Sequence, residues 1–216
     1  MMRQSMVRLA ALSGVLVLMA GCAPLFHPSA PPTYYALNVP APQDLPCPRK
    51  EASLCVWPFA ASQPYDRTEM VIASNAHQML FSSQHRWVAA PGEMLAEQIA
   101  TALSAGGPFQ TVVMPGNPAA PPSWNLSGHI HRFALSRNSD KVNAELDVRV
   151  VLWKEGTHRE VRFQKTYGMK EEVQGTVRPE LFAEAMSRAV GRLVERLARD
   201  LCAAVAGPSP DSPPRP

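Results

Sequence analysis

The sequence predicts a single α/β domain, a two-layer sandwich in which a mixed, mostly antiparallel sheet carries two helices on one face. Two observations indicate this fold. Strand-like segments form two groups, within 33–81 and within 109–169, and each group is followed by one segment with helical periodicity, at 91–105 or 179–205. Without its first 21 residues, the chain keeps 195 of its 216 residues, which is enough for one domain with a real core.

The first group contains four short strand-like segments that are bounded by turns. Each is rich in β-branched, aromatic or other apolar residues, and Pro, Ser, Asn or charged residues flank it. The four segments are 33–39, 53–59, 69–73 and 77–81. Residues 40–50 are expected to form a loop, Pro64-Tyr65-Asp66-Arg67 a turn, and Ser74–Asn75 the turn of a hairpin.

Residues 91–105 are expected to form the first helix. Its apolar face carries Leu95, Ile99, Ala102 and Leu103. Pro91 suits a first helical turn, and Gly106-Gly107-Pro108 ends the helix. Residues 109–114 then return as a strand, and the Pro-rich stretch 115–122 is a loop.

Residues 124–137 and 140–153 are expected to form a long β-hairpin. Apolar and polar residues alternate along the second arm, so one face of that strand is buried and the other is exposed to water. In the first arm, the alternation shifts phase between Ile130 and Phe133, which is what a β-bulge produces. Residues 158–169 form the last strand.

Residues 179–205 are expected to form the longest helix. Its apolar stripe consists of Phe182, Met186, Ala189, Leu193, Leu197 and Leu201. Charged residues occupy the opposite side at i, i+4 spacing, which is typical of a solvated face. The tail 207–216 is rich in Pro and Ser and is expected to be disordered.

The first 21 residues have the features of a secretory signal peptide. Arg3 and Arg8 precede a short apolar run from Leu9 to Met19, too short to span a bilayer. Ala20-Gly21-Cys22 resembles a bacterial lipobox, which implies cleavage before Cys22 and lipid on its thiol and new amino terminus. Residues 22–32 would then form a Pro-rich tether. Nothing after Cys22 is long and apolar enough to be a second membrane span.

The charge balance of the mature chain is nearly neutral. With the two arginines of the signal removed, 19 basic and 18 acidic residues remain, for a net charge of +1. A surface of this kind gives no electrostatic footprint for nucleic acid.

Three cysteines remain once Cys22 is acylated. Export places them in an oxidising compartment, where a disulfide is the default use. Cys47 and Cys55 lie close in sequence and are expected to form the bond, with Cys202 left as a buried apolar residue. Pairing of Cys202 with either of the others stays open at this point.

No catalytic or metal-binding motif is recognisable in the sequence. His129 and His131 lie two residues apart on a strand, but no Cys, Asp or Glu has matching ligand spacing nearby. Nucleophile elbows, Gly-rich phosphate loops and HExxH helices are missing. We therefore expect no enzyme activity, no metal and no cofactor.

Residues 33–204 resemble the ABC-type transport auxiliary lipoprotein family. The resemblance depends on Tyr34-Tyr35-Ala36-Leu37 after the tether, Pro64-Tyr65-Asp66-Arg67, Trp87 ahead of the Pro91 helix, and the hairpin that follows Leu126. The helix from Pro179 completes the order. Cys47, Cys55 and the loop 115–122 depart from the family pattern.

The resemblance implies a non-catalytic periplasmic lipoprotein in an MCE/ABC-type system for intermembrane lipid transport. Its partners would be an MCE-domain protein and an ABC permease complex, with phospholipid and a second copy as further candidates. The domain would span 33–206, with Tyr34, Tyr35 and Trp87 as candidate partner contacts or core residues.

Ala23 follows the lipidated cysteine, and the absence of Asp there favours the periplasmic face of a Gram-negative outer membrane, by the sorting rule known for enterobacteria. The competing interpretations are a structural envelope lipoprotein that handles no lipid and a periplasmic hydrolase with an unrecognised site.

Overall fold

The structure is a computed structural model that describes residues 30–40, 47–116, 122–138, 141–156 and 158–206. The chain divides into two compact units, residues 1–31 and 32–216, and the second contains every helix and strand of the described residues. The signal peptide, Cys22 and the tail 207–216 lie outside the described residues.

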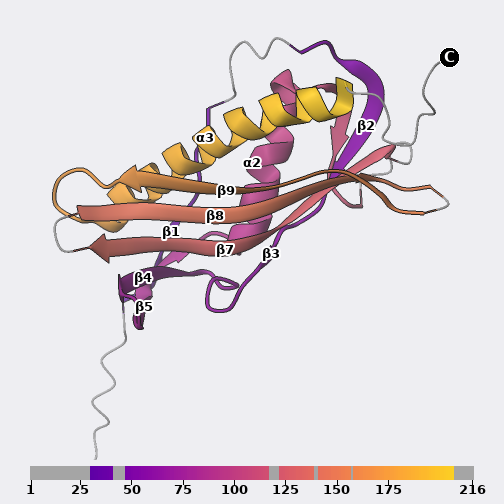
Figure 1. Cartoon of the computed structure of the whole chain (residues 1–216). Coiled ribbons are helices and arrows are strands. Elements are labelled where there is room, and N and C mark those ends of the chain that lie inside the picture. Colours follow the sequence, from indigo (N-terminus) through magenta and orange to yellow (C-terminus); the bar gives the residue numbers. More distant parts are fainter. Residues whose placement is uncertain (1–29, 41–46, 117–121, 139–140, 157, 207–216) are drawn as a thin grey trace, which may run out of the picture. The chain divides into compact units, whose positions relative to one another are not determined.

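Three long antiparallel strands form one half of the sheet. Strand β7 (Trp124–Asn138) pairs with β8 (Lys141–Lys154), which pairs in turn with β9 (Glu160–Glu172). The three strands run side by side in Figure 1. The predicted hairpin and last strand are therefore confirmed.

The other edge of β7 pairs with three different strands in succession. The first residues of β7 pair with β2 (Lys50–Val56), the middle ones with β3 (Ala60–Ala61), and Leu135 and Ser136 with β4 (Glu69–Asn75), all parallel. The sheet is thus mixed and divided along this edge of β7.

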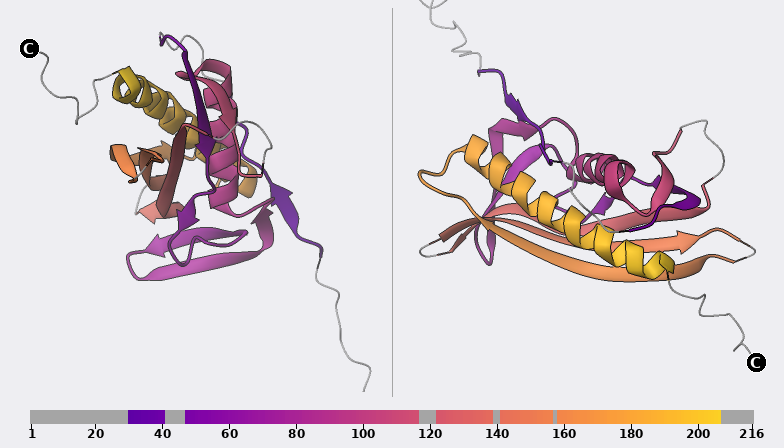
Figure 2. Two further views of the ribbon diagram at one scale, coloured as in Figure 1. Left: turned by 90° about the vertical axis from the view of Figure 1, so that its right-hand side faces the viewer. Right: turned by 90° about the horizontal axis from the view of Figure 1, so that it is seen from above.

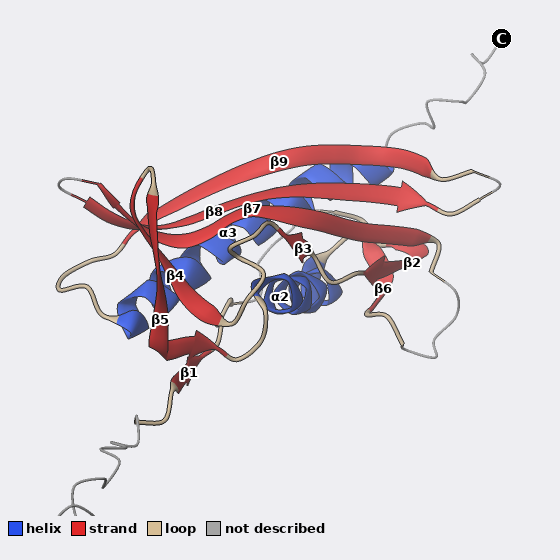
Figure 3. Cartoon of the chain, turned by 90° about the horizontal axis from the view of Figure 1, so that it is seen from below, coloured by secondary structure: helices blue, strands red, loops and turns tan. Residues whose placement is uncertain are grey.

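Each half of the divided edge is extended by further strands. Strand β6 (Phe109–Val113) pairs parallel with β2. On the other side, β4 forms an antiparallel hairpin with β5 (Gln78–Trp87), and β1 (Thr33–Tyr35) adds to β5 in parallel. Figure 3 shows these two groups at opposite ends of β7.

The predicted β-bulge in β7 is present. The pairing of β7 with β8 shifts register between Ile130 and Arg132, so His131 is the additional residue. Ile130 and Phe133 are both buried. The bulge therefore lets β7 keep its apolar side chains in the core although their spacing in sequence is three rather than two.

Both predicted helices are confirmed and lie on one face of the sheet. They are α2 (Pro91–Gly106) and α3 (Pro179–Ala206). Helix α3 lies behind the long strands in the view from below in Figure 3 and in front of them in the view from above in Figure 2, and α2 packs against β2, β6, β7 and α3. The apolar stripe of α3, from Phe182 to Leu201, is buried against the sheet. Burial of this stripe supplies the second layer of the sandwich.

Two glycines allow Phe59 to fit between α2 and β7. A Cβ atom at Gly92 would lie 1.9 Å from the Phe59 carbonyl oxygen, and one at Gly128 would lie 2.3 Å from the Phe59 ring. The Phe59 backbone N–H donates to the Gly92 carbonyl oxygen at 3.2 Å. Only a residue without a side chain permits these approaches.

Strands β1 and β5 differ most in length from the sequence prediction. Strand β1 ends at Tyr35 rather than continuing to Val39, because the chain turns from the sheet to α3 and the Asn38 N–H donates to Ser187 Oγ at 3.1 Å. Strand β5 extends to Trp87 rather than ending at Phe81. Its extra residues pair with β1, a partner that lies about 50 residues away in the sequence and that local periodicity cannot reveal.

Candidate functional site

The edge formed by β1 and β5 is the part of the domain where the chain enters the sheet. Tyr34 is 57% exposed there. The Tyr35 hydroxyl donates to Glu180 Oε1 at 3.0 Å and lies 3.1 Å from His85 Nδ1. Tyr35 therefore connects β1, β5 and the first turn of α3.

The charges at this edge are coupled through Tyr35. Burial and the carboxylate of Glu180 raise the pKa of the Tyr35 hydroxyl. The backbone N–H of Glu180 and the Tyr35 hydroxyl hold the pKa of the Glu180 carboxyl below its ordinary value. A carboxylate in the first turn of α3 also complements the positive end of the helix dipole.

Trp87 is not available to a partner. Its side chain is 1% exposed and packs edge-on against Phe133, with ring centroids 5.4 Å apart, and against Phe182, at 5.5 Å. The contact role predicted for Trp87 is therefore wrong for this structure. The residue joins β5, β7 and α3 in the core, the other role that the sequence allowed.

The β4–β5 hairpin exposes a run of apolar side chains within a segment that the sequence predicts as an ordinary strand. Met79, Leu80 and Phe81 are 37%, 49% and 44% exposed. The Arg67 guanidinium carbon lies 4.2 Å from the centroid of the Phe81 ring. Three consecutive apolar residues without alternation were the available sequence signal, because neighbours on a strand point to opposite faces and cannot all face one core.

Two clefts adjoin the amino-terminal half of α3. A groove of about 490 Å³ lies between residues 36–40 and the outer side of α3. Its arginines, Arg188 and Arg192, are paired with the buried Glu171, whose oxygens lie 2.7 and 2.9 Å from Arg192 nitrogens. The groove therefore presents little unpaired positive charge.

The second cleft, of about 170 Å³, lies between β4, β5, β7 and the start of α3. Met70, Leu135 and Phe182 form an apolar floor, and Arg137 and Arg178 are at the exposed rim. An apolar floor beside cationic groups is chemically suited to a small amphiphilic anion.

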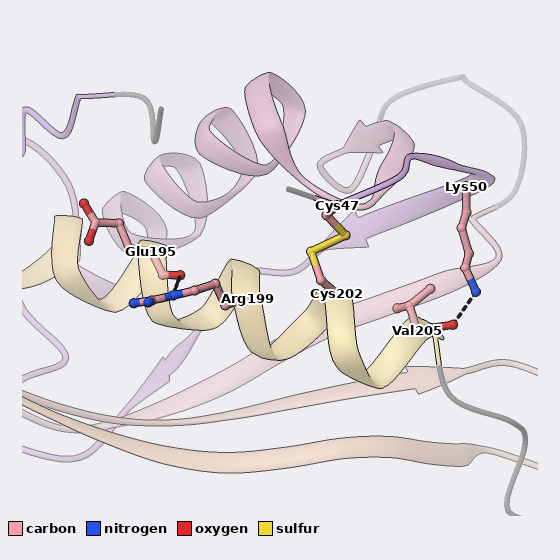
Figure 4. The surroundings of a disulfide bond; sticks show 6 residues. All are labelled: Cys47, Lys50, Glu195, Arg199, Cys202 and Val205. Atoms are coloured by element: carbon pink, nitrogen blue, oxygen red, sulfur yellow. Dashed lines mark hydrogen bonds between the residues drawn. A yellow bond between two sulfur atoms is a disulfide. The ribbon is translucent and has the colours of Figure 1, made fainter. Parts of the chain in front are cut away.

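The disulfide differs from the pairing predicted. Cys47 bonds to Cys202 on α3, with Cα atoms 6.0 Å apart, and Cys55 is a buried free thiol (Figure 4). Cys55 lies within β2, where an extended chain of five residues from Lys50 spans roughly 17 Å. A disulfide needs Cα atoms about 4.4–6.8 Å apart, so the extension of β2 disfavours the Cys47–Cys55 bond.

Residues 47–50 contact the carboxyl ends of both helices. Arg49 Nη2 donates to the carbonyl oxygens of Ser104 and Ala105 at the end of α2, at 3.1 and 2.7 Å. Lys50 Nζ donates to the Val205 carbonyl oxygen near the end of α3 (Figure 4). Basic side chains at these positions satisfy the last carbonyls and oppose the negative end of each helix dipole. We refer to residues 47–50 as the clip.

His129 and His131 lie close together despite the bulge, with ring centroids 4.8 Å apart. His129 Nε2 is 2.7 Å from Ser62 Oγ, and no carboxylate in the described part of the chain contacts the other ring nitrogen. No group of three potential metal ligands occurs among the described residues. None of the helices described is long and apolar enough to cross a membrane.

Comparison with known proteins identifies the fold and the family. The domain resembles the crystal structure of XCC0632 from Xanthomonas campestris, described as a DUF330 protein, with a TM-score of 0.72 at 16% identity over 80% of this chain and 96% of that one. A second structure, of an uncharacterised protein, has a TM-score of 0.62 at 13% identity over 80% of this chain and 99% of that one.

At these identities the likeness to solved structures concerns the fold alone. No curated protein matches the chain. A family model described as "ABC-type transport auxiliary lipoprotein component" matches residues 35–198, about three quarters of the sequence. The chain therefore belongs to the ABC-type transport auxiliary lipoprotein family.

Proposed function

We propose that this protein is the outer-membrane-anchored, non-catalytic component of an MCE/ABC-type system that moves lipid between the two membranes of a Gram-negative envelope. The observation that carries the proposal is the family match over residues 35–198, directly behind a lipobox at Cys22. Acylated Cys22 would hold the domain at the membrane, residues 22–32 would act as a tether, and 33–206 would be the working domain.

Two features support export to the periplasm. The first is the short apolar run with small residues before Cys22. The second is the bond between Cys47 and Cys202, because structural disulfides persist mainly in oxidising compartments. The absence of Asp after Cys22 favours sorting to the outer membrane.

A tether favours an auxiliary role through effective concentration. A linker of about ten residues confines the domain near other proteins of the same membrane, so a modest intrinsic affinity for a partner suffices. Tyr34 is the candidate contact that remains at the surface, whereas Tyr35 is partly buried. An MCE-domain protein and an ABC permease complex are the expected partners, with phospholipid as cargo.

A deletion strain tests this function. We expect loss of the gene to change the phospholipid balance of the outer membrane and to lower detergent resistance. Complementation with the wild-type gene should restore both, whereas Cys22→Ala should restore neither although the domain is made. Unchanged lipid balance, together with a loss of envelope integrity alone, would favour the structural envelope lipoprotein that handles no lipid.

A further inference from the structure

The exposed apolar side chains of the domain are concentrated near its first strand. Seven large hydrophobic residues are exposed in the described part of the chain, and five lie on β1, on β5 or directly after β5. Three of these five, Met79, Leu80 and Phe81, form an uninterrupted run that we call the apolar segment. The left view of Figure 2 shows the β4–β5 hairpin projecting below the rest of the domain.

The apolar segment lies outside the hydrophobic core and is not among the partly buried residues that pack against it. In the register of the hairpin, Phe81 is opposite Val71 and Met79 is opposite Ala73, and both of these β4 residues are buried. Leu80 points to the other side of the strand and is also exposed. Apolar residues on both faces of one strand leave neither face suited to water, which is typical of an interaction site.

The length of the tether limits the distance between β1 and the lipid anchor. Ten residues lie between Cys22 and Thr33, so the start of β1 lies within about 40 Å of an acylated cysteine even when the chain is fully extended. Strand β1 pairs directly with β5, the strand that carries the apolar segment. The hairpin therefore shares the strand pair at which the tether joins the domain.

The charge beside the segment fits a lipid surface. Arg67 stacks on the Phe81 ring at 4.2 Å and forms no ion pair among the described residues. An aromatic ring with a cationic neighbour is suited to the boundary between acyl chains and phosphate headgroups. The opposite end of the long strands has a comparable exposed residue, Val161, which pairs with Trp153 far from β4.

We propose that Met79, Leu80 and Phe81 insert into the interfacial layer of the membrane that holds the lipid anchor, with Arg67 at the phosphate level. The proposal depends on the anchoring of Cys22 that the proposed function includes. Insertion would fix the orientation of the tethered domain relative to the bilayer.

The test uses the full-length, lipidated protein in liposomes of phosphatidylethanolamine and phosphatidylglycerol. Leu80→Cys is labelled with the environment-sensitive fluorophore NBD, and Val161→Cys is the matched control because these side chains are 49% and 51% exposed. Wild-type protein treated in the same way measures stray labelling of Cys55. Brominated lipids quench a probe inside the bilayer, and aqueous iodide quenches one outside it.

We expect the emission of the Leu80→Cys probe to shift to shorter wavelength, and we expect this probe to be quenched by brominated lipids and shielded from iodide. The Val161→Cys probe should be quenched by iodide and not by brominated lipids, with no shift to shorter wavelength. Iodide quenching at both positions would overturn the proposal. The lipidated protein is also examined in detergent micelles. If the probe stays shielded from iodide there and the protein crosslinks as a dimer, the apolar segment binds a second copy of this chain instead of the membrane.

A failure of the anchor has a different signature. If Cys22 carries no lipid, the intact mass lacks the acyl groups and the protein does not float with the liposomes. That result contradicts the anchor on which both proposals depend. Flotation with an exposed probe at Leu80→Cys contradicts insertion alone. A supporting variant, Leu80→Glu with Phe81→Glu, should increase protease access to the hairpin of the floated protein, whereas Val161→Glu should leave that access unchanged.

Discussion

Phe59 shows how strongly single residues determine the contact between α2 and the sheet. The residue follows Pro58, three positions after the end of β2, and its carbonyl oxygen and ring face the two glycines, Gly92 and Gly128. Because the backbones approach so closely, no side chain can be accommodated at either glycine without moving a helix or a strand.

Gly92→Ala is expected to destabilise the protein by about 1–3 kcal/mol, the usual cost of inserting a carbon into a packed core. The reason is the 1.9 Å separation between the new Cβ and the Phe59 carbonyl oxygen. Urea unfolding followed by circular dichroism measures the effect. Gly156→Ala is the control, since its Cβ would meet only the His158 carbonyl oxygen, at 3.5 Å. Equal midpoints for the two variants would contradict the packing described here.

At the scale of elements, the clip and the cross-strand ion pairs connect segments that are far apart in the sequence. The clip joins residues 47–50 to the ends of α2 and α3 through one disulfide and three side-chain hydrogen bonds to carbonyl oxygens. In the long strands, Glu145 on β8 accepts from Arg132 on β7 and pairs with Lys170 on β9, at 2.7 and 3.1 Å.

Loss of the Cys47–Cys202 bond should destabilise the folded domain by about 2–5 kcal/mol, because the bond closes a loop of 155 residues in the unfolded chain. Cys47→Ser, Cys202→Ser and the double variant should lose equal amounts, since each removes the same bond. Denaturant unfolding measures the losses. A non-reducing peptide map in which Cys55 is linked to Cys47 would contradict the pairing.

The carboxylate of Glu145 should contribute to acid sensitivity. Burial opposes its ionisation, but hydrogen bonds from Arg132 and Lys170 outweigh burial and hold the pKa of this carboxyl below its ordinary value of 4.5. A lowered pKa gives stability that is present above pH 4.5 and is lost as the pH falls through the folded-state value.

Glu145→Gln should therefore lower stability near neutral pH and flatten the loss of unfolding free energy below about pH 4.5. Thermal unfolding at a series of pH values measures the profile. Glu172→Gln is the control, because its ion pair with Lys141 is on the surface, where such pairs contribute little. An acid profile of Glu145→Gln as steep as that of the wild type would argue against the role of this carboxylate.

At the scale of the whole molecule, the order and type of the elements could be predicted from local periodicity. The helix stripes, the long hairpin and the bulge beside Ile130 all follow from spacing within one segment. Long-range pairing could not be predicted in this way. The three partners of one edge of β7 and the extension of β5 toward β1 depend on residues distant in sequence.

The candidate site was predicted less completely than the fold. Tyr34 is exposed, as a contact residue should be, but Trp87 is a core residue. The sequence alone could not separate these two roles, because aromatic residues occur both at interfaces and in cores. The cysteine pairing could not be predicted without knowing that β2 is extended and that Cys202 lies on α3. The apolar segment on β5 had a local signal, three apolar residues in succession, but its exposure depends on the projection of the hairpin.

Anchoring is a property of the whole chain and has a direct test. Cys22→Ala should leave uncleaved precursor or soluble periplasmic protein, because acylation of Cys22 is the proposed link to the membrane. Fractionation with mass measurement of the amino-terminal peptide detects both species. Membrane retention of Cys22→Ala with an unchanged mature mass would contradict the anchor. Ala23→Asp is an informative companion, since it should redirect the lipoprotein to the inner membrane where the enterobacterial sorting rule applies.

The central claim is that this lipoprotein works beside an MCE-domain protein and an ABC permease. The most direct measurement is crosslinking in intact cells, followed by affinity purification of the full-length lipidated protein and mass spectrometry of what is joined to it. We expect the MCE-domain protein as the main crosslinked partner, reduced in a Tyr34→Glu variant and retained in Val161→Glu. Recovery of other envelope proteins, with no MCE-domain protein or ABC permease subunit crosslinked in the wild type, would contradict the claim.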